Sequence, residues 1–226
     1  WACCAAALAL RMALGLLWVR QAARAPGTDP HWQARLASMA RGAGIARQVG
    51  LRVVEGLASP VTAGWLKPVV LVPAALVTGM PAHLLEALLA HELSHIEKRH
   101  TLRNIAGTIG RQLLVTLVAG GQNSVLGSVA SQADALKGLQ YSRALETEAD
   151  DNGLALLSQQ HIDPKGMLSL IRMLQQQTGG HEELSFLSTH PVFEERIQHI
   201  KEQIASLPRG KTMSAASRRT FHELYE

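Results

Sequence analysis

The stretch His91-Glu92-Leu93-Ser94-His95 forms an H-E-x-x-H motif inside a strongly helical segment, residues 81–100. Positions i and i+4 of a helix share one face, so the imidazoles of His91 and His95 can hold one zinc ion. Glu92 lies one position beyond His91 and can take a proton from a water on that ion. The motif therefore predicts one zinc per chain and favours metallopeptidase chemistry.

Apolar residues surround the motif on most of the helix circumference. Leu84 and Leu88 lie on the same stripe as the two histidines. A second stripe consists of Leu85, Leu89, Leu93 and Ile96. Such a helix is buried, and two buried histidines beside a glutamate need partners that a metal can supply. The competing interpretation is an exposed helix that carries two histidines by chance, and the apolar surroundings argue against it.

A catalytic zinc needs a third protein ligand and an open position. Glu146 and Asp150 lie at i and i+4 of a second expected helix, residues 136–159. Glu146 can bind the zinc, while Asp150 can accept a hydrogen bond from the free ring nitrogen of a ligand histidine. Glu148 is the competing ligand, but it points to roughly the opposite side of the helix from Glu146. A helix rich in carboxylates is also typical of a solvated face.

The H-E-L-S-H motif, followed by the S-R-x-x-E-x-E-A-D segment at residues 142–150, resembles the HtpX-type zinc metallopeptidases. That group includes the CAAX prenyl endopeptidases and the BepA-like proteases. The resemblance implies that Glu146, four residues before Asp150, is the third zinc ligand. It also implies a mostly helical, zincin-like domain of the α+β class, with a small β-sheet whose edge strand flanks the active-site helix.

A later segment, Ser188-Thr189-His190-Pro191 followed by Glu195-Arg196-Ile197, is similar to a T-H-P-x-x-x-x-R-I segment of the same group. The resemblance implies that His190 and Arg196 are catalytic residues over the active site, near the oxyanion or the fourth zinc position. The residues alone indicate a helix start with Pro191 in the first turn. Both interpretations can hold together.

The segment Ser59–Pro73 resembles the one that precedes the H-E-x-x-H helix in the BlaR-type membrane peptidases. Short β-branched runs at residues 51–55 and 69–72 predict strands. We expect Val69, Val70, Leu71 and Val72 to form a sheet edge that binds a peptide substrate as an added strand.

The composition, 47% hydrophobic and 18% charged, is apolar for a freely soluble protein. Residues 1–52 carry seven arginines against one acid, Asp29, and no aromatic interleaving suggests nucleic-acid binding. A membrane lipid surface is therefore the expected anionic partner. We expect residues 1–24 to be a membrane-anchoring or membrane-surface segment. If this segment spans a bacterial inner membrane, the arginines that follow residue 19 favour the cytoplasmic face for the catalytic domain, with the periplasmic face as the alternative.

We expect residues 25–207 to form one zinc metallopeptidase domain and residues 208–226 a basic, flexible tail. Further helices are predicted at residues 30–48, 163–177 and 191–207, and residues 104–133 form either a mobile cover or a helix on the bilayer. The predicted function is a membrane-associated zinc metalloendopeptidase that hydrolyses misfolded or membrane-linked proteins. The alternative is a latent or non-hydrolytic zinc-binding sensor of BlaR type, and the intact Glu92 argues against a non-hydrolytic site.

Overall fold

The computed structural model describes residues 10, 13–15, 17–24, 29–57, 59–64, 66–118, 143–177, 190 and 194–207. The predicted tail at 208–226, residues 119–133 of the predicted cover, and Pro191 lie outside the described residues. The chain divides into two compact units, Trp1–Met80 and Pro81–Glu226. The first unit holds a small sheet and the second is helical, so the expected mostly helical α+β class is confirmed.

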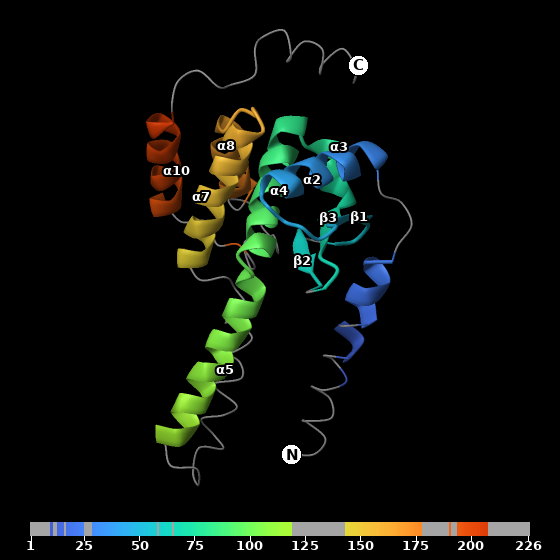
Figure 1. The fold of residues 1–226 in the computed structure, drawn as a ribbon, viewed down its shortest axis with the longest axis vertical. Helices are drawn as coiled ribbons and strands as arrows, with labels where there is room; N and C mark the ends of the chain where they lie inside the picture. The colour runs from blue at the N-terminus through green and yellow to red at the C-terminus, as the bar shows by residue number, and fades with distance from the viewer. Residues whose placement is uncertain are drawn as a thin grey trace. The chain divides into compact units, whose positions relative to one another are not determined.

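The sheet of the first unit has three strands in the order β1-β3-β2 (Figure 1). Strand β1 (Gly50–Val54) runs parallel to β3 (Val69–Pro73), and β2 (Val61–Ala63) runs antiparallel to β3. The two predicted strands are confirmed, whereas the three-residue β2 is too short to show an alternating pattern. Gly64 follows β2 with a φ of +83°, and a Cβ there would lie 2.3 Å from the Lys67 carbonyl oxygen. The turn into β3 therefore requires glycine.

The prediction that Val69, Val70, Leu71 and Val72 form a sheet edge was wrong. Strand β3 is central, with β1 on one side and β2 on the other, so its backbone groups pair within the sheet. All five residues of the strand are buried. Five buried residues in a row are typical of a central strand with both faces covered.

One of the two outer strands is capped by a side chain. The Gln33 amide donates to the Val49 carbonyl oxygen at 3.0 Å and accepts from the Leu51 N–H at 2.8 Å. The Leu51 carbonyl accepts from Arg52 Nη1 at 2.6 Å. These contacts occupy backbone groups on the outer side of β1, so β2 is the better candidate for pairing with an added strand.

Gln33 lies on α2 (Pro30–Gly42), which packs against β1. Asp29 caps this helix, because its Oδ1 accepts from the His31 N–H at 2.8 Å. The helix ends earlier than the predicted residue 48, since Gly44 takes a φ of +72° just beyond it. A short helix that was not predicted, α3 (Ala74–Gly79), follows β3.

The last residues of the N-terminal segment, Ala22 and Ala23, pack onto the sheet. Ala22 lies in a core cluster with Val69 and Leu71, and the carbonyl oxygen of Ala23 accepts from Arg52 Nε at 3.1 Å. Large apolar side chains before it are exposed: Leu10, Leu14, Leu17 and Trp18. None of the helices among the described residues has both the length and the apolar character needed to cross a membrane.

The second unit is built around α4 (Ala82–Glu97), which corresponds to the predicted motif helix. Helices α7 (Arg143–Gln159) and α8 (Lys165–Gln177) pack against α4, and α10 (Glu194–Ser206) packs against both of them. Helix α5 (His100–Val118) extends from the end of α4 away from the other helices (Figure 1). Residues 104–118 of the segment predicted as a mobile cover or a helix on the bilayer are therefore regular helix.

Two glycines let the helices approach α4 closely. A Cβ on Gly166 of α8 would lie 2.8 Å from the backbone carbonyl oxygen of His83. A Cβ on Gly153 of α7 would lie 2.7 Å from the Cε of Met167, and 3.5 Å from the backbone nitrogen of His91. Glycine at these positions sets the distance between the helices, and so fixes where the side chains of α7 stand relative to those of α4.

Candidate metal centre

Four buried side chains of the second unit converge so that one ligand atom of each lies within 4.8 Å of the others. Helix α4 supplies His91 and His95, since a spacing of four residues places both rings on one face. Helix α7 supplies Glu146, and His190 lies shortly before α10. The structure thus brings together the three ligands expected from the sequence and one of the two further residues expected over the site.

The distances between neighbouring ligand atoms are short enough for one metal ion to bind all four side chains. His91 Nε2 lies 3.0 Å from His95 Nε2 and 3.4 Å from His190 Nδ1. Glu146 Oε1 lies 3.4 Å from His95 Nε2 and 3.1 Å from His190 Nδ1. Metal–ligand bonds of ~2.0–2.1 Å place the corners of a tetrahedron ~3.3–3.4 Å apart. The residues therefore fit a single metal ion with four protein ligands.

A second layer of buried charged groups supports two of the ligands. Asp150 Oδ1 lies 3.0 Å from Nδ1 of His91, on the side of the ring away from the cluster. Arg196 Nη2 donates to Asp150 Oδ1 at 2.8 Å, its Nε donates to Asp150 Oδ2, and its Nη1 lies 2.9 Å from Glu146 Oε2. The structure thus places Asp150 where the sequence predicted it, and places Arg196 behind the carboxylates.

Glu92 lies beside the cluster with its side chain fully buried. Neither carboxylate oxygen has a hydrogen-bond partner among the described residues, and the closest ionic contact is His190 Nε2, 3.5 Å from Oε1. Burial raises the pKa of Glu92, although His190 and His91 oppose the change. A buried carboxylate with unused oxygens costs free energy, which is typical of a group kept for chemistry.

The environment perturbs the pKa of His91, His95 and Glu146. Burial would lower the pKa of His91, but hydrogen bonds to Asp150 and Glu146 outweigh it and raise the pKa to about 9. Burial lowers the pKa of His95 well below its usual value, with a further contribution from His91. Burial would raise the pKa of Glu146, but His190 and His91 hold it well below its usual value.

The formal charges give a second test of fit. Glu92, Glu146 and Asp150 are three buried carboxylates, and Arg196 is the one buried guanidinium in contact with two of them. Fully ionised, these four groups carry a net charge of minus two. A buried charge of that size requires compensation, and a divalent cation supplies it.

His100 is a buried residue at the site that the sequence analysis missed. Its Nδ1 lies 2.8 Å from Nδ1 of His95, and its side chain is completely buried. Burial lowers the pKa of His100, while Glu148 opposes the change. The available signal was a third histidine five residues after the motif, a spacing that does not share a face on one continuous helix.

The model of peptidase family M48 matches residues 27–204, most of the chain. The chain belongs to peptidase family M48. The match includes the H-E-x-x-H motif, Glu146, His190 and Arg196, and it confirms the resemblance to the zinc metallopeptidases. It also spans residues 59–73, so the segment that resembles the BlaR-type peptidases lies inside the M48 match.

Several named M48-like proteases are similar to this chain. Metalloprotease YcaL of Escherichia coli is 32% identical over 129 residues, which cover 54% of this chain and 49% of YcaL. Mitochondrial metalloendopeptidase OMA1 of Schizosaccharomyces pombe is 37% identical over 121 residues, covering 52% and 35%. A putative beta-barrel assembly-enhancing protease of Vibrio cholerae is 28% identical over 137 residues, covering 55% and 28%. The chain therefore spans about half the length of YcaL and less of the other two.

Proposed function

We propose that the chain is a zinc-dependent metalloendopeptidase, with zinc held by His91, His95 and Glu146. The observation that supports this best is the buried cluster of four possible ligands beside Glu92, whose carboxylate has no hydrogen-bond partner among the described residues. Two or three imidazole nitrogens with one carboxylate oxygen are a donor set typical of zinc. Zinc bound there supplies Lewis acidity toward a peptide carbonyl and lowers the pKa of a water molecule.

Glu92 is the general base in this proposal. Its burial raises its pKa toward neutrality, which makes the carboxylate a stronger base than an exposed glutamate. Glu92 takes a proton from the attacking water as the new C–O bond forms, and passes that proton to the leaving amine as the C–N bond breaks. Asp150 holds the ring of His91, and Arg196 anchors Asp150 and Glu146 rather than facing a substrate. This anchoring role replaces the oxyanion role that the resemblance implied for Arg196.

His190 gives the proposal a latent state. Its Nδ1 lies 3.1 Å from Glu146 Oε1 and 3.4 Å from His91 Nε2, at the fourth corner of the cluster. A side chain in that corner competes with water for the position that catalysis needs open. We therefore propose that the described conformation is inactive and that His190 must leave the cluster before hydrolysis begins.

The substrate is proposed to be an extended polypeptide in a misfolded or membrane-linked protein. Because β3 is central and the outer side of β1 is capped by Gln33, a peptide added to the sheet would pair with β2. Backbone pairing accepts many side-chain sequences, which suits a quality-control protease. The name of the Vibrio cholerae relative also connects this type of protease with protein assembly.

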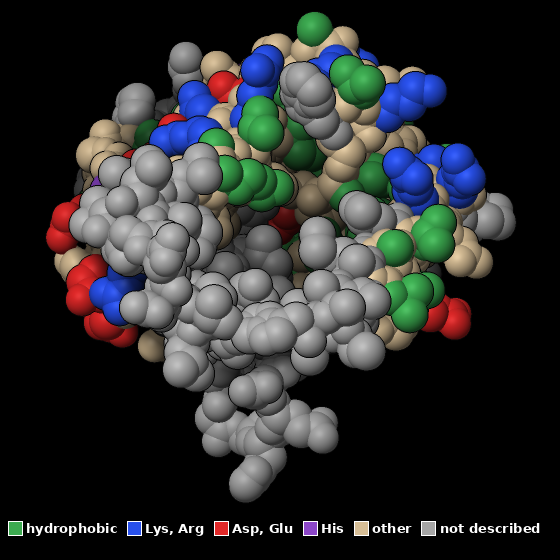
Figure 2. Space-filling model, turned by 90° about the horizontal axis from the view of Figure 1, so that it is seen from below, with side chains coloured by type: hydrophobic (Ala, Val, Ile, Leu, Met, Phe, Trp, Pro, Cys, Tyr) green, Lys and Arg blue, Asp and Glu red, His purple; other side chains and the backbone are tan. Residues whose placement is uncertain are grey.

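Association with a membrane surface is a further part of the proposal. Leu10, Leu14 and Leu17 are 56–60% exposed, and the basic residues Arg20 and Arg24 follow them. On the face drawn in Figure 2, hydrophobic side chains adjoin those of Lys and Arg, a mixture that suits anionic lipid. Co-sedimentation with anionic and neutral vesicles tests this part. If the protein stays in the supernatant to the same extent with anionic and with neutral vesicles, the proposed membrane association is refuted.

Hydrolysis of casein by the zinc-loaded chain and by Glu92→Gln tests the proposed function. The glutamine amide cannot accept a proton, so the variant should bind zinc as the wild type does but lose ~10²–10⁴-fold in kcat. Chelation should abolish wild-type hydrolysis, and added zinc should restore it. Because the described conformation is proposed to be latent, His190→Ala with and without Glu92→Gln is assayed in parallel. Hydrolysis by the double variant His190→Ala, Glu92→Gln at the rate of His190→Ala would refute the mechanism, because neither chain carries the side chain that is proposed to block the site.

A further inference from the structure

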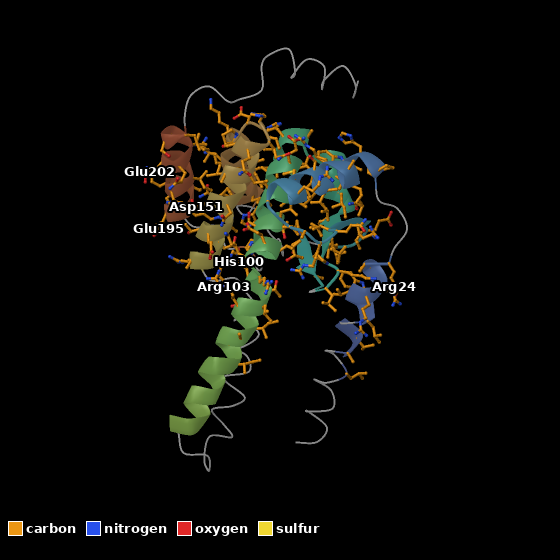
Figure 3. The ribbon with its side chains drawn as sticks, viewed as in Figure 1. Arg24, His100, Arg103, Asp151, Glu195 and Glu202 are labelled. Atoms are coloured by element: carbon orange, nitrogen blue, oxygen red, sulfur yellow. The ribbon has the colours of Figure 1, made fainter. Side chains whose placement is uncertain are left out.

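His100 lies outside the four-residue cluster but contacts one of its members. Its Nδ1 is 2.8 Å from Nδ1 of His95, on the side of that ring away from the cluster. Its Nε2 lies 3.3 Å from Glu148 Oε2, and Arg103 Nη1 donates to the same oxygen at 2.7 Å. Figure 3 shows His100 and Arg103 near the start of α5. The side chains of His95, His100, Glu148 and Arg103 thus form a row that leads from the cluster to the surface.

The positions of the ring nitrogens determine where the protons must lie. Nε2 of His95 faces the cluster, 3.0 Å from His91 Nε2, so a metal would take the lone pair there. The proton of neutral His95 then lies on Nδ1 and points at Nδ1 of His100. His100 Nδ1 must accept the hydrogen bond from this N–H, so the proton of His100 lies on Nε2, facing the carboxylate of Glu148. Each ring nitrogen thus has one role, and the row ends on an anion.

We propose that His100 is a positioning residue, which holds His95 in the tautomer and orientation that metal binding requires, with Glu148 as the anion behind it. His91 has the same support directly, since Asp150 Oδ1 lies 3.0 Å from its Nδ1. Both histidine ligands of α4 are thus backed by a carboxylate of α7, one directly and one through His100. Outer partners of this kind fix the orientation of ligand rings and raise their affinity for metal.

The backbone between α4 and α5 is shaped to make this contact. On a continuous helix, a residue five positions after His95 would lie ~140° around the axis and could not meet its ring. Arg99 instead adopts a φ of 55°, a left-handed conformation that costs a non-glycine residue ~1–2 kcal/mol. The turn at Arg99 brings His100 back to His95. The chain accepts a strained residue at the one position that sets this contact.

The alternative explanation is that His100 has only a packing role and fills space beside His95. In that case any apolar side chain of similar size would serve, and the position of a hydrogen-bond acceptor would not matter. Asparagine separates the two roles, because its Oδ1 stands close to where the histidine Nδ1 stood and can accept from His95. Leucine fills the space but accepts nothing.

The test compares His100→Leu, His100→Asn and Glu148→Ala in the full chain. Zinc affinity is measured by competition with a chromogenic chelator, and the ligand field by the absorption spectrum of the cobalt-loaded protein. We expect His100→Leu to bind zinc ~10–100-fold more weakly and to change the cobalt spectrum. His100→Asn should keep most of the affinity, and Glu148→Ala should lie between them.

His199→Leu serves as the matched control. His199 Nε2 lies 2.7 Å from Asp151 Oδ1, so this variant also removes a histidine–carboxylate contact with α7. It does so away from the four cluster residues, and zinc affinity should therefore stay at the wild-type value. A loss of affinity in His199→Leu equal to that in His100→Leu would show that the effect is general destabilisation, and would overturn the inference.

The inference rests on the proposed metal site, and the outcomes separate the two. A wild-type chain that binds no zinc would refute the proposed function and the inference together. If the wild-type chain binds zinc and a folded His100→Leu variant binds zinc within about twofold of the wild-type affinity, the inference alone would be overturned. Equal losses in His100→Asn and His100→Leu would also overturn it. If His100→Leu does not fold, the zinc affinity of Glu148→Ala tests the inference instead, because the Glu148 side chain is 35% exposed and its removal should not prevent folding. Wild-type zinc affinity in Glu148→Ala would overturn the inference.

Discussion

Replacing Arg196 by methionine should destabilise the second unit strongly, because it removes the cation that two buried carboxylates share. The guanidinium is fully buried, with Nε and Nη2 on Asp150 and Nη1 2.9 Å from Glu146 Oε2. Methionine keeps an unbranched apolar stem but none of these donors. Burial would raise the pKa of Asp150, but Arg196 lowers it below its usual value, so the carboxylate remains ionised in the wild type.

Breaking a buried ion pair by removing one partner costs ~3–5 kcal/mol, since the remaining charge is left uncompensated. For a chain of 226 residues, ~1 kcal/mol corresponds to ~2–4 °C in Tm, so a fall of ~6–20 °C is expected. Asp150 contributes stability above its unfolded pKa of ~3.9, and this contribution is lost as the pH falls through the lower folded value. The difference between variant and wild type should therefore shrink as the pH falls below about 4. Bound metal should also reduce it, because a divalent cation beside Glu146 supplies compensation.

Urea unfolding of the metal-free chain at pH 7, followed by far-UV circular dichroism, measures the free energy of unfolding. Arg172→Met is the matched control, since Arg172 is an exposed arginine on α8, and it should change stability by less than ~0.5 kcal/mol. If Arg196→Met stays within ~1 kcal/mol of this control, the anchoring role is wrong. Preserved stability with lost hydrolysis would instead assign Arg196 to the substrate, as the resemblance implied.

Four further predictions concern single substitutions. His190→Ala should weaken zinc binding, because one corner of the cluster is lost, and should increase casein hydrolysis; reduced hydrolysis with unchanged zinc affinity would assign His190 to the transition state instead. Asp150→Asn should weaken zinc binding ~10–100-fold in chelator competition, since a neutral amide supports His91 less well, and unchanged affinity would contradict this. Gly166→Ala should cost ~1–3 kcal/mol in urea unfolding, because its Cβ meets the His83 backbone at 2.8 Å. Gly153→Ala should cost less, since Met167 Cε can move aside, and a reversed order would show that Met167 is the more rigid neighbour.

The sequence predicted the elements that local patterns control. The apolar positions around His91 and His95 define α4 on all sides, and the β-branched runs define β1 and β3. Glu146 and Asp150 were predicted as ligand and support, and the structure places both at the cluster. Their positions agree with the prediction because helical spacing decides which residues of one helix share a face, while their roles as ligand and support stay predictions.

Contacts set by tertiary structure could not be predicted in the same way. The central position of β3 depends on β2, whose three residues carry no usable pattern, although the unbroken run Val69–Val72 was itself a sign of burial on both faces. His100 meets His95 only because Arg99 turns the chain. Likewise, Arg196 shows in sequence as a helix residue, and only the packing of α10 on α7 reveals that it holds Asp150 and Glu146.

The buried charges link the stability of the second unit to metal binding. Three buried carboxylates and one buried guanidinium leave an excess of negative charge, which a positively charged group must compensate. In the metal-free chain, protons compensate part of it: contacts with Asp150 and Glu146 raise the pKa of His91 to about 9, and burial raises that of Glu92. A divalent cation compensates the same excess and leaves His91 neutral and Glu92 free to act as a base. We therefore expect a bound divalent cation to stabilise the packing of α4, α7 and α10, because it compensates the buried carboxylates that hold these helices together.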